Sequence, residues 1–181
     1  MGRRAGTVPG HRRLVLLRHA KAAWPHGVPD HERPLAGKGR RNARAAGQWF
    51  RGVVPRPDLV LCSDALRARQ TWELVAAALA GPAVPLRLEG RLYGADPGDL
   101  LDLVREEPDG VGVLAVVGHQ PTLAMTALLL AGAGSDRGAL ARLREKYPTN
   151  GIAVLRVDGP WAGLTAGGAV LESFDVPRSD G

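Results

Sequence analysis

The residues Val111–Val117 read VGVLAVV and contain no side chain that can form a hydrogen bond. The run is much shorter than the roughly 20 residues that span a bilayer, and its valines favour a strand. A short, wholly apolar run is typical of a strand buried on both faces. Such a strand needs strands beside it and helices above and below it, so this run restricts the chain to an α/β fold.

The rest of the chain alternates between strand and helix patterns. Short apolar runs predict strands at Arg13–Leu17, Asp58–Leu61 and Leu86–Leu88. Helical spacing and helix-ending residues predict helices at Lys38–Phe50, Ala65–Ala80, Asp96–Glu106 and Pro121–Leu130. Two further strands, at Ile152–Val157 and Ala169–Phe174, are joined by turn-rich sequence. We therefore expect a three-layer α/β/α sandwich with a mostly parallel central sheet, helices on both faces and a C-terminal antiparallel hairpin.

The length of 181 residues suits one domain. We expect a single domain over residues 13–176, a flexible basic N-terminal tail over 1–12 and a disordered C-terminal tail over 177–181. No apolar run approaches a membrane span, and Leu14–Leu17 is too short for the core of a signal peptide. The single cysteine, Cys62, cannot form an internal disulfide, so the expected compartment is the cytoplasm.

The formal net charge of +6 predicts an anionic partner, either a nucleic acid or a small anionic substrate. Aromatic residues make up only 4% of the chain, which leaves little for base stacking, and no helix-turn-helix or zinc-finger pattern is present. These features argue against a nucleic-acid binder. A phosphate-binding protein without catalysis remains the other non-enzyme alternative.

Reactive side chains follow three of the predicted strands. Arg18, His19 and Lys21 follow the first strand, and Ser63 with Arg67 follows the second. His119 follows the Val111–Val117 strand. Because ligands bind at the carboxyl ends of parallel strands, we expect these groups to meet in one site.

The residue types at these strand ends suit phosphoryl transfer. Arg18 and Arg67 offer planar sets of donors that match phosphate oxygens. A neutral His19 can attack phosphorus and form a covalent intermediate, while a protonated His119 would stabilise negative charge in the transition state. This chemistry requires no metal or cofactor, and the other histidines, His11, His26 and His31, lack the spacing of metal ligands.

Three sequence motifs resemble those of the histidine phosphatase superfamily, which has the phosphoglycerate mutase-like fold. They are RHAK (residues 18–21), SDALRARQT (63–71) and GHQP (118–121). DHERPLAGKGRRNA (30–43) and KYPTNGIAVLRV (146–157) are similar to the SixA-type phosphohistidine phosphatases within it. The resemblance implies a metal-independent hydrolase that acts on a phosphorylated protein through a phosphohistidine intermediate. It implies His19 as nucleophile, Arg18 and Arg67 as phosphate clamps, and His119 as the second pocket histidine.

The proton donor is an open position in this sequence. Mutase-like members of the superfamily carry a glutamate three residues before a Tyr-Gly pair, whereas Gly90 stands three residues before Tyr93 and Glu89 is one place off. The gap favours phosphohistidine as substrate, because a phosphoramidate is protonated more readily than an ester. Asp30 is a candidate general acid, or else a helix-entry or salt-bridge residue. Ser63 either contacts phosphate or caps the next helix, and Lys21 either contributes positive field or is solvated.

Three further functions remain open. The chain could be a phosphomonoesterase for a small phosphorylated metabolite, such as a sugar phosphate or a nucleotide. It could also act together with a Nudix protein. That partner would be a separate chain, because this sequence contains no Nudix box. A non-catalytic phosphopeptide binder is possible on the same fold, although the presence of both histidines and both arginines argues against it.

Overall fold

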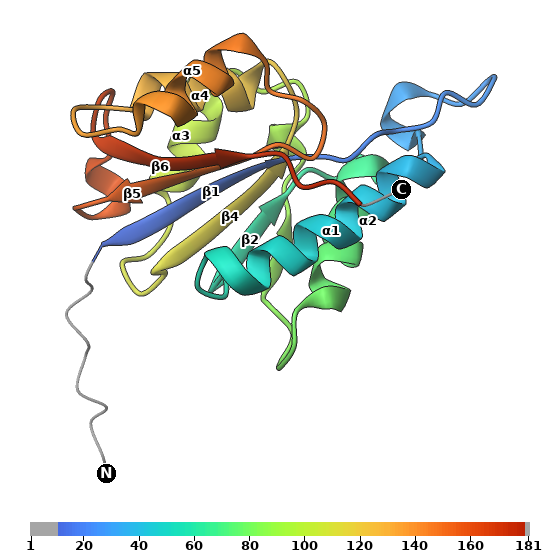
Figure 1. Ribbon diagram of the computed structural model, residues 1–181, viewed down its shortest axis with the longest axis horizontal. Helices are drawn as coiled ribbons and strands as arrows, with labels where there is room; N and C mark the ends of the chain where they lie inside the picture. Colours follow the sequence, from blue (N-terminus) through green and yellow to red (C-terminus); the bar gives the residue numbers. More distant parts are fainter. Residues whose placement is uncertain (1–10, 180–181) are drawn as a thin grey trace.

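Six strands form one mixed sheet with helices on both of its faces (Figure 1). The structure is a computed structural model that describes residues 11–179. The strands are β1 (Arg12–Arg18), β2 (Leu59–Cys62), β3 (Leu86–Leu88), β4 (Val113–Gly118), β5 (Ile152–Val157) and β6 (Ala169–Asp175). Their order is β3-β2-β4-β1-β5-β6, in which β3, β2, β4 and β1 are parallel, β5 is antiparallel to β1, and β6 to β5. The predicted fold class is confirmed, and the Val111–Val117 run forms the central strand β4.

The helices lie in two layers, one on each face of the sheet (Figure 1). They are α1 (Gly37–Val53), α2 (Leu66–Ala78), α3 (Pro97–Arg105), α4 (Thr122–Leu130) and α5 (Arg137–Glu145). Alternate strand residues face opposite layers. Val15 belongs to the core with Phe50 of α1 and Trp72 of α2, whereas Leu16 belongs to the core with Leu123 of α4. The central strands are therefore covered by helices on both faces, whereas the edge strand β3 is exposed.

The sequence patterns missed α5. This helix has nine residues and is rich in arginine, and among its residues only Ala139 and Leu143 are buried. Its apolar residues, Ala139–Ala141 and Leu143, lie close together over five positions, which is too short a stretch to give a clear helical periodicity. Its one local signal is Asp136, whose carboxylate caps the helix by accepting from the Ala139 amide at 2.7 Å.

Both ends of the predicted domain shift slightly in the structure. Arg12, expected in the N-terminal tail, begins β1, while residues 1–10 lie outside the described part. At the other end, expected to be disordered, Pro177 accepts a hydrogen bond from Asn150 and the Ser179 amide donates to Asn42. Residues 180–181 lie outside the described part. Residues 177–179 thus follow β6 back across α1.

None of the helices within residues 11–179 is both long enough and apolar enough to cross a membrane.

Candidate active site

The carboxyl ends of β1, β2 and β4 bring the predicted residues together. Arg18 is in register with Gly118, and Cys62 with Val117, so His19, Ser63 and His119 each follow directly after a strand end. The His19 amide donates to the Gly118 carbonyl at 3.1 Å. Parallel pairing therefore fixes the backbone of these residues independently of their side chains.

His19 is held in one tautomer. Its Nδ1 lies 2.8 Å from the Ala20 carbonyl, which can only accept, so Nδ1 carries the proton. Nε2 is then the lone-pair nitrogen, and it accepts from Arg67 Nε at 3.3 Å. The side chain is 8% exposed, and burial lowers the pKa of His19 to about 3. Near neutral pH His19 is therefore an uncharged imidazole whose Nε2 lone pair faces a guanidinium.

Arg67 lies on the first turn of α2 and is buried. Besides Nε, it donates from one terminal nitrogen to the Asp30 backbone carbonyl at 2.6 Å and from the other to Asp30 Oδ2 at 3.0 Å. An arginine has five N–H donors, and these bonds use three of them. Two donors of a fixed, buried guanidinium therefore remain for a ligand.

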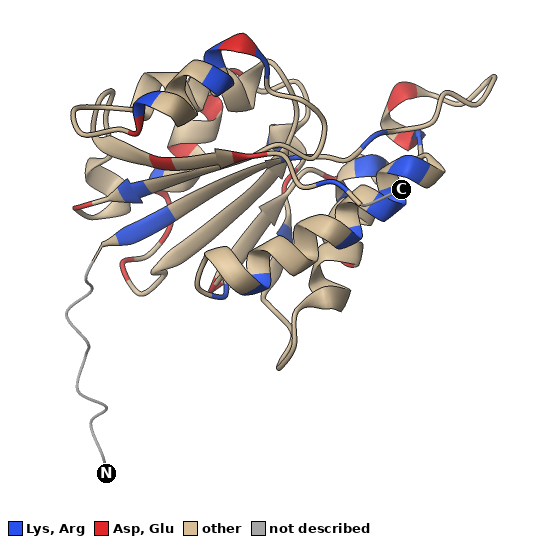
Figure 2. Cartoon of the chain, viewed as in Figure 1, with Lys and Arg blue, Asp and Glu red and all other residues tan. Residues whose placement is uncertain are grey.

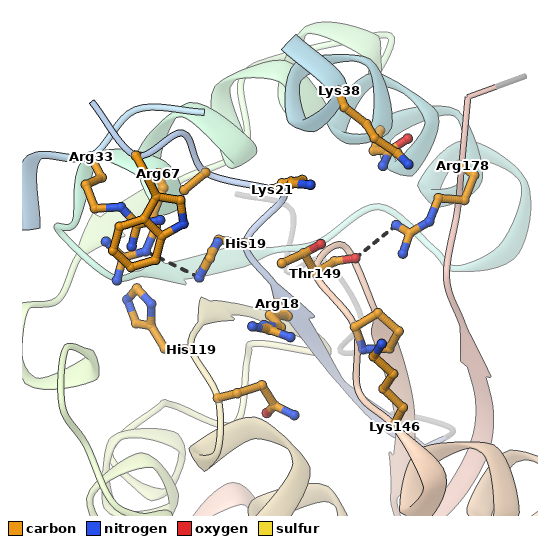
Figure 3. Close-up of a pocket in the computed structure, with 15 residues that line it drawn as sticks. Arg18, His19, Lys21, Arg33, Lys38, Arg67, His119, Lys146, Thr149 and Arg178 are labelled. Atoms are coloured by element: carbon orange, nitrogen blue, oxygen red, sulfur yellow. Dashed lines mark hydrogen bonds between the residues drawn. The ribbon is translucent and has the colours of Figure 1, made fainter. Parts of the chain in front are cut away.

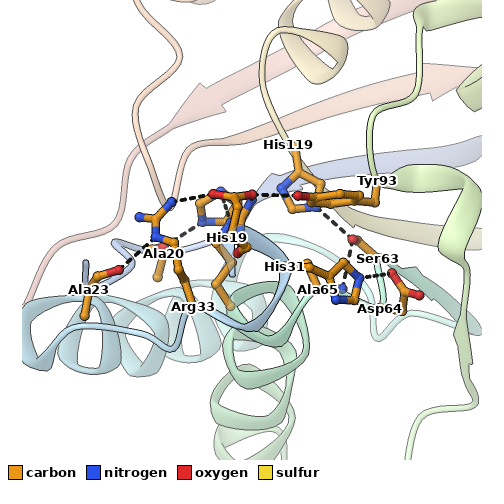
Figure 4. A network of polar contacts seen from close by, with 12 residues as sticks. His19, Ala20, Ala23, His31, Arg33, Ser63, Asp64, Ala65, Tyr93 and His119 are labelled. Atoms are coloured by element: carbon orange, nitrogen blue, oxygen red, sulfur yellow. Dashed lines mark hydrogen bonds and ion pairs between the residues drawn. The ribbon is translucent and has the colours of Figure 1, made fainter. Parts of the chain in front are cut away.

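Asp30 accepts hydrogen bonds from the side chains of Arg33, Arg67 and Tyr93. Figure 4 shows the surrounding network of polar contacts, with Arg33 and Tyr93 labelled. Asp30 begins the short 3-10 helix η1 (Asp30–Glu32) and accepts from Tyr93 Oη at 2.7 Å and from Arg33 at 2.8 Å. Hydrogen bonds from Tyr93 and Arg33, together with the charge of Arg67, hold the pKa of Asp30 far below its usual range. Asp30 is thus an ionised salt-bridge residue in this structure.

His119 approaches His19 from the end of β4, with 5.1 Å between the two ring centroids. Its Nε2 lies 2.7 Å from Ser63 Oγ, so Ser63 holds this ring rather than capping α2, whose N-cap is Ala65. Burial, followed by the charge of Arg67, lowers the pKa of His119 to about 4. The ligand-free ring is therefore neutral, and a bound anion would be needed for the protonated form expected from the sequence.

Arg18 is anchored from the opposite side, by the segment after α5. One of its terminal nitrogens donates to the Tyr147 carbonyl at 2.8 Å. The Asn150 amide binds the carbonyls of Arg18 and His19, both at 3.1 Å, and Asn150 adopts a positive φ of 66°. This segment thus fixes both the Arg18 side chain and the backbone that carries His19.

A cavity of about 610 Å³ opens beside these groups (Figure 3). Arg18, His19, Arg67 and His119 line it, and so does the exposed Lys21. Asp30 and Ser63 are not part of its lining, but they contact Arg67 and His119, which are. Within residues 11–179, no group of three or more His, Cys, Asp or Glu side chains is arranged to hold a metal ion.

Two residues beside the site, Tyr93 and Arg33, were not predicted as site residues from the sequence. Tyr93 was visible only as the partner of a missing glutamate, yet its hydroxyl binds Asp30 and its ring contacts His119 edge-on, with 5.6 Å between ring centroids. Arg33 pairs with Asp30 and stacks on Trp24, with its guanidinium carbon 3.2 Å from the ring centroid. Glu89, which stands one place away from the glutamate position of mutase-like members, forms an ion pair with Arg91. The contacts of Tyr93 join segments far apart in the chain, so no local pattern could predict them. The Arg33 pair with Asp30 spans only three residues and was a local signal that the sequence patterns did not use.

Comparisons with known proteins agree with this geometry. A family model of the histidine phosphatase superfamily, branch 1, matches residues 14–111. The uncharacterized protein Rv1276c of Mycobacterium tuberculosis is 48% identical over 163 residues, which cover 90% of this chain and all of that protein. The chain belongs to the histidine phosphatase superfamily.

Within that superfamily the structure is SixA-like. A Nakamurella multipartitia structure assigned as the phosphohistidine phosphatase SixA superposes with a TM-score of 0.83 at 38% identity, over 94% of this chain and 99% of the other. A structure of the protein histidine phosphatase SixA complexed with tungstate has a TM-score of 0.70 at 25% identity, over 91% and 97% of the two chains. The predicted resemblance is confirmed at the level of family, fold and SixA-like structure.

Proposed function

We propose that this chain is a phosphohistidine phosphatase that transfers a phosphoryl group first to His19 Nε2 and then to water. One observation carries the proposal. His19 Nε2 is a lone-pair nitrogen in a neutral, buried ring, and the fixed guanidinium of Arg67 lies 3.3 Å from it. A nucleophile beside a preorganised cation is the arrangement that attack on a phosphate dianion requires.

In the proposed first step, Arg18 and Arg67 bind the phosphoryl oxygens and hold phosphorus in front of His19. Nε2 forms a bond to phosphorus while the bond to the leaving group breaks, and the leaving group departs with its electron pair and takes up a proton. In the second step, water attacks the phosphorus of phospho-His19, and inorganic phosphate and neutral His19 are released. Dividing one displacement into two avoids a direct attack by water on the substrate.

His119 would become protonated only once the phosphoryl group is bound. Its pKa of about 4 reflects burial and the nearby Arg67 charge, and a phosphoryl dianion reverses the local field. An imidazolium there would then stabilise the transferring oxygens. We assign Ser63 the role of orienting this ring, because its Oγ lies 2.7 Å from His119 Nε2.

Asp30 has a positioning role in this proposal. A carboxyl group that is ionised by three donors has no proton to give. Its contacts instead orient Arg67 and Tyr93. Without a built-in acid, the favoured substrate is a phosphoramidate, whose leaving nitrogen is readily protonated by solvent.

The relatives support this substrate class. One SixA-like structure is described as a phosphohistidine phosphatase, and another is that of the protein histidine phosphatase SixA complexed with tungstate. Tungstate is a tetrahedral oxyanion like phosphate. We infer that the equivalent position in this chain, between Arg18, His19 and Arg67, takes the phosphoryl group.

The proposal is tested by trapping the intermediate. Rapid acid-free quenching of a turnover mixture should give a base-stable, acid-labile phosphate on His19, and His19→Asn should remove both the label and the activity while the fold stays intact by circular dichroism. Activity should persist in the presence of a chelator. Label on a serine or aspartate, activity in His19→Asn, or loss of activity on chelation would each contradict the proposed chemistry. Parallel rates on a phosphohistidine protein, sugar phosphates and nucleotides decide the substrate class.

A further inference from the structure

Four basic side chains lie around His19 on the side of the cavity away from Arg67. They are Lys21 after β1, Lys38 on α1, Lys146 at the end of α5 and Arg178 after β6, and we call them the basic rim (Figure 3). All four are exposed. They come from four separate segments of the chain, so their convergence on one cavity is a property of the fold and not of one charged stretch.

The rim carries more positive charge than one phosphoryl group requires. The cavity is lined by seven Lys and Arg residues, and within residues 11–179 no Asp or Glu lines it. Arg33 and Arg67 share the Asp30 carboxylate, whereas no ion pair among the described residues involves Arg18 or the rim. Five cations are thus uncompensated. A phosphoryl group supplies only about two negative charges.

Gathering uncompensated cations in one cavity is unfavourable by mutual repulsion. Some basic side chains elsewhere have acidic partners, as Arg91 has in Glu89 and Glu106. Others, such as Arg40 and Arg44 on α1, form no ion pair either, but they do not line this cavity. What distinguishes the rim is that its cations share one cavity with Arg18 and that no described Asp or Glu lines that cavity. The cavity also extends well beyond the volume of one phosphate, since it reaches from His119 to Arg178.

We propose that the basic rim binds a second anionic group, a carboxylate or a phosphate, carried by the part of the substrate that leaves. This inference rests on the proposed function, because the phosphoryl group occupies the Arg18 and Arg67 side. The rim then selects for substrates in which the transferred group has an anionic neighbour. Such a neighbour is either an acidic side chain beside a phosphohistidine in a protein or a second acidic group in a small metabolite.

The experiment compares matched pairs of substrates. One pair is 4-(carboxymethyl)phenyl phosphate and its neutral carboxamide; the other is two phosphohistidine peptides that differ only in Glu or Gln beside the modified residue. The wild-type protein should prefer the acidic member by kcat/KM. In the double variant Lys38→Gln/Lys146→Gln the preference should fall by about five- to tenfold, the effect of two partly exposed charge contacts. Raising the salt concentration should reduce the wild-type preference in the same way.

The matched control is Arg40→Gln/Arg44→Gln, which removes two exposed charges from α1 outside this cavity and should leave the preference unchanged. A preference confined to the peptides would assign the second anion to a protein, and one confined to the aryl phosphates to a metabolite. No preference in the wild type, or an equal loss in both double variants, would overturn the proposal. If no substrate turns over, the proposed phosphatase function is wrong, but the rim can still be tested. Calorimetry then compares the affinities of the acidic and neutral compounds for both double variants.

Discussion

The two sides of the cavity carry similar side chains in opposite states. On the Arg67 side, each cation is buried and has fixed partners: Arg67 binds His19 and Asp30, and Arg33 binds Asp30 and stacks on Trp24. On the rim, Lys21, Lys38, Lys146 and Arg178 are exposed and form no ion pair within the described residues. Figure 2 shows that Lys and Arg positions (blue) are spread over several separate segments of the chain, including α1. The cations of one side are thus buried and held by an acidic partner, whereas those of the rim are exposed and have none. Of the four rim side chains, Arg178 does bind backbone, since it donates to the Thr149 carbonyl at 2.9 Å.

This difference assigns different tasks to the two sides. A buried guanidinium held by three hydrogen bonds needs no reorganisation when charge develops in a transition state, so it can accelerate the chemical step. An exposed lysine is screened by salt and must lose conformational freedom on binding. Changes on the Arg67 side should therefore lower kcat, whereas changes on the rim should alter the preference between substrates.

The largest effect is expected for Arg67→Ala. Removing a charged donor from a preorganised oxyanion site costs about 2 to 4 kcal/mol of transition-state stabilisation, which is roughly 30- to 1000-fold in kcat/KM. The loss should appear mainly in kcat for an aryl phosphate. Arg18→Ala should act in the same range, since its guanidinium is also anchored, by the Tyr147 carbonyl.

The control for both variants is Arg44→Ala, which removes an exposed arginine from α1. A rate for Arg67→Ala within tenfold of wild type would remove Arg67 from the clamp. It would also break the contrast between the two sides, because the buried cation would then matter no more than an exposed one.

The site residues at the strand ends were predictable from the sequence, whereas the loop residues that contact the site were not. Short apolar runs place Arg18, His19 and His119 after parallel strands, and parallel strands bring their carboxyl ends to one edge. Tyr93 reaches Asp30 across 63 positions of the chain, and such a contact depends on the path of two loops. Sequence periodicity carries no information on loop paths.

The charge states of His19 and Asp30 could not be predicted from the sequence either. His19 and Asp30 have pKa values displaced by burial and by neighbours from other segments. The sequence predicted both residues for one site and left Asp30 open as an acid or a salt-bridge residue; in the structure both contact Arg67. The basic rim could not be predicted either, because its residues come from separate segments of the chain. Lys38 and Lys146 have the sequence pattern of solvated positions, and only the fold brings them to one cavity.

A smaller effect is expected for Asp30→Asn. If Asp30 positions Arg67, the variant should lose about tenfold or less in kcat, and by the same factor for aryl phosphates with good and with poor leaving groups. A general acid would give a different pattern, since its loss hurts poor leaving groups most. The measurement is kcat for a series of substituted phenyl phosphates on both proteins. A steeper dependence on leaving-group pKa in Asp30→Asn would make Asp30 the proton donor.

The smallest effect is on stability, and it concerns the buried side alone because the rim contains no histidine. Burial lowers the folded-state pKa of His19 to about 3, below its unfolded value. Between these two values the unfolded chain binds more protons than the folded one, so the stability contributed by neutral His19 is present above the unfolded pKa and is lost as pH falls toward the folded pKa. The free energy of unfolding should therefore decrease as pH falls from about 6.5 to 5, with His19 contributing at most about 1.4 kcal/mol per pH unit.

Urea unfolding of wild type and His19→Asn at several pH values in this range measures the effect. The slope of the free energy of unfolding against pH should be smaller in the variant by roughly the contribution of one proton. Other groups do not obscure this difference, because carboxylates of the unfolded chain are already ionised there and His119 contributes equally to both proteins. Identical slopes would mean that folding does not lower the pKa of His19, so that the folded ring takes up a proton over this pH range. A protonated ring has no lone pair on Nε2, so the nucleophile on the buried side of the cavity would then be lost progressively below about pH 6.5.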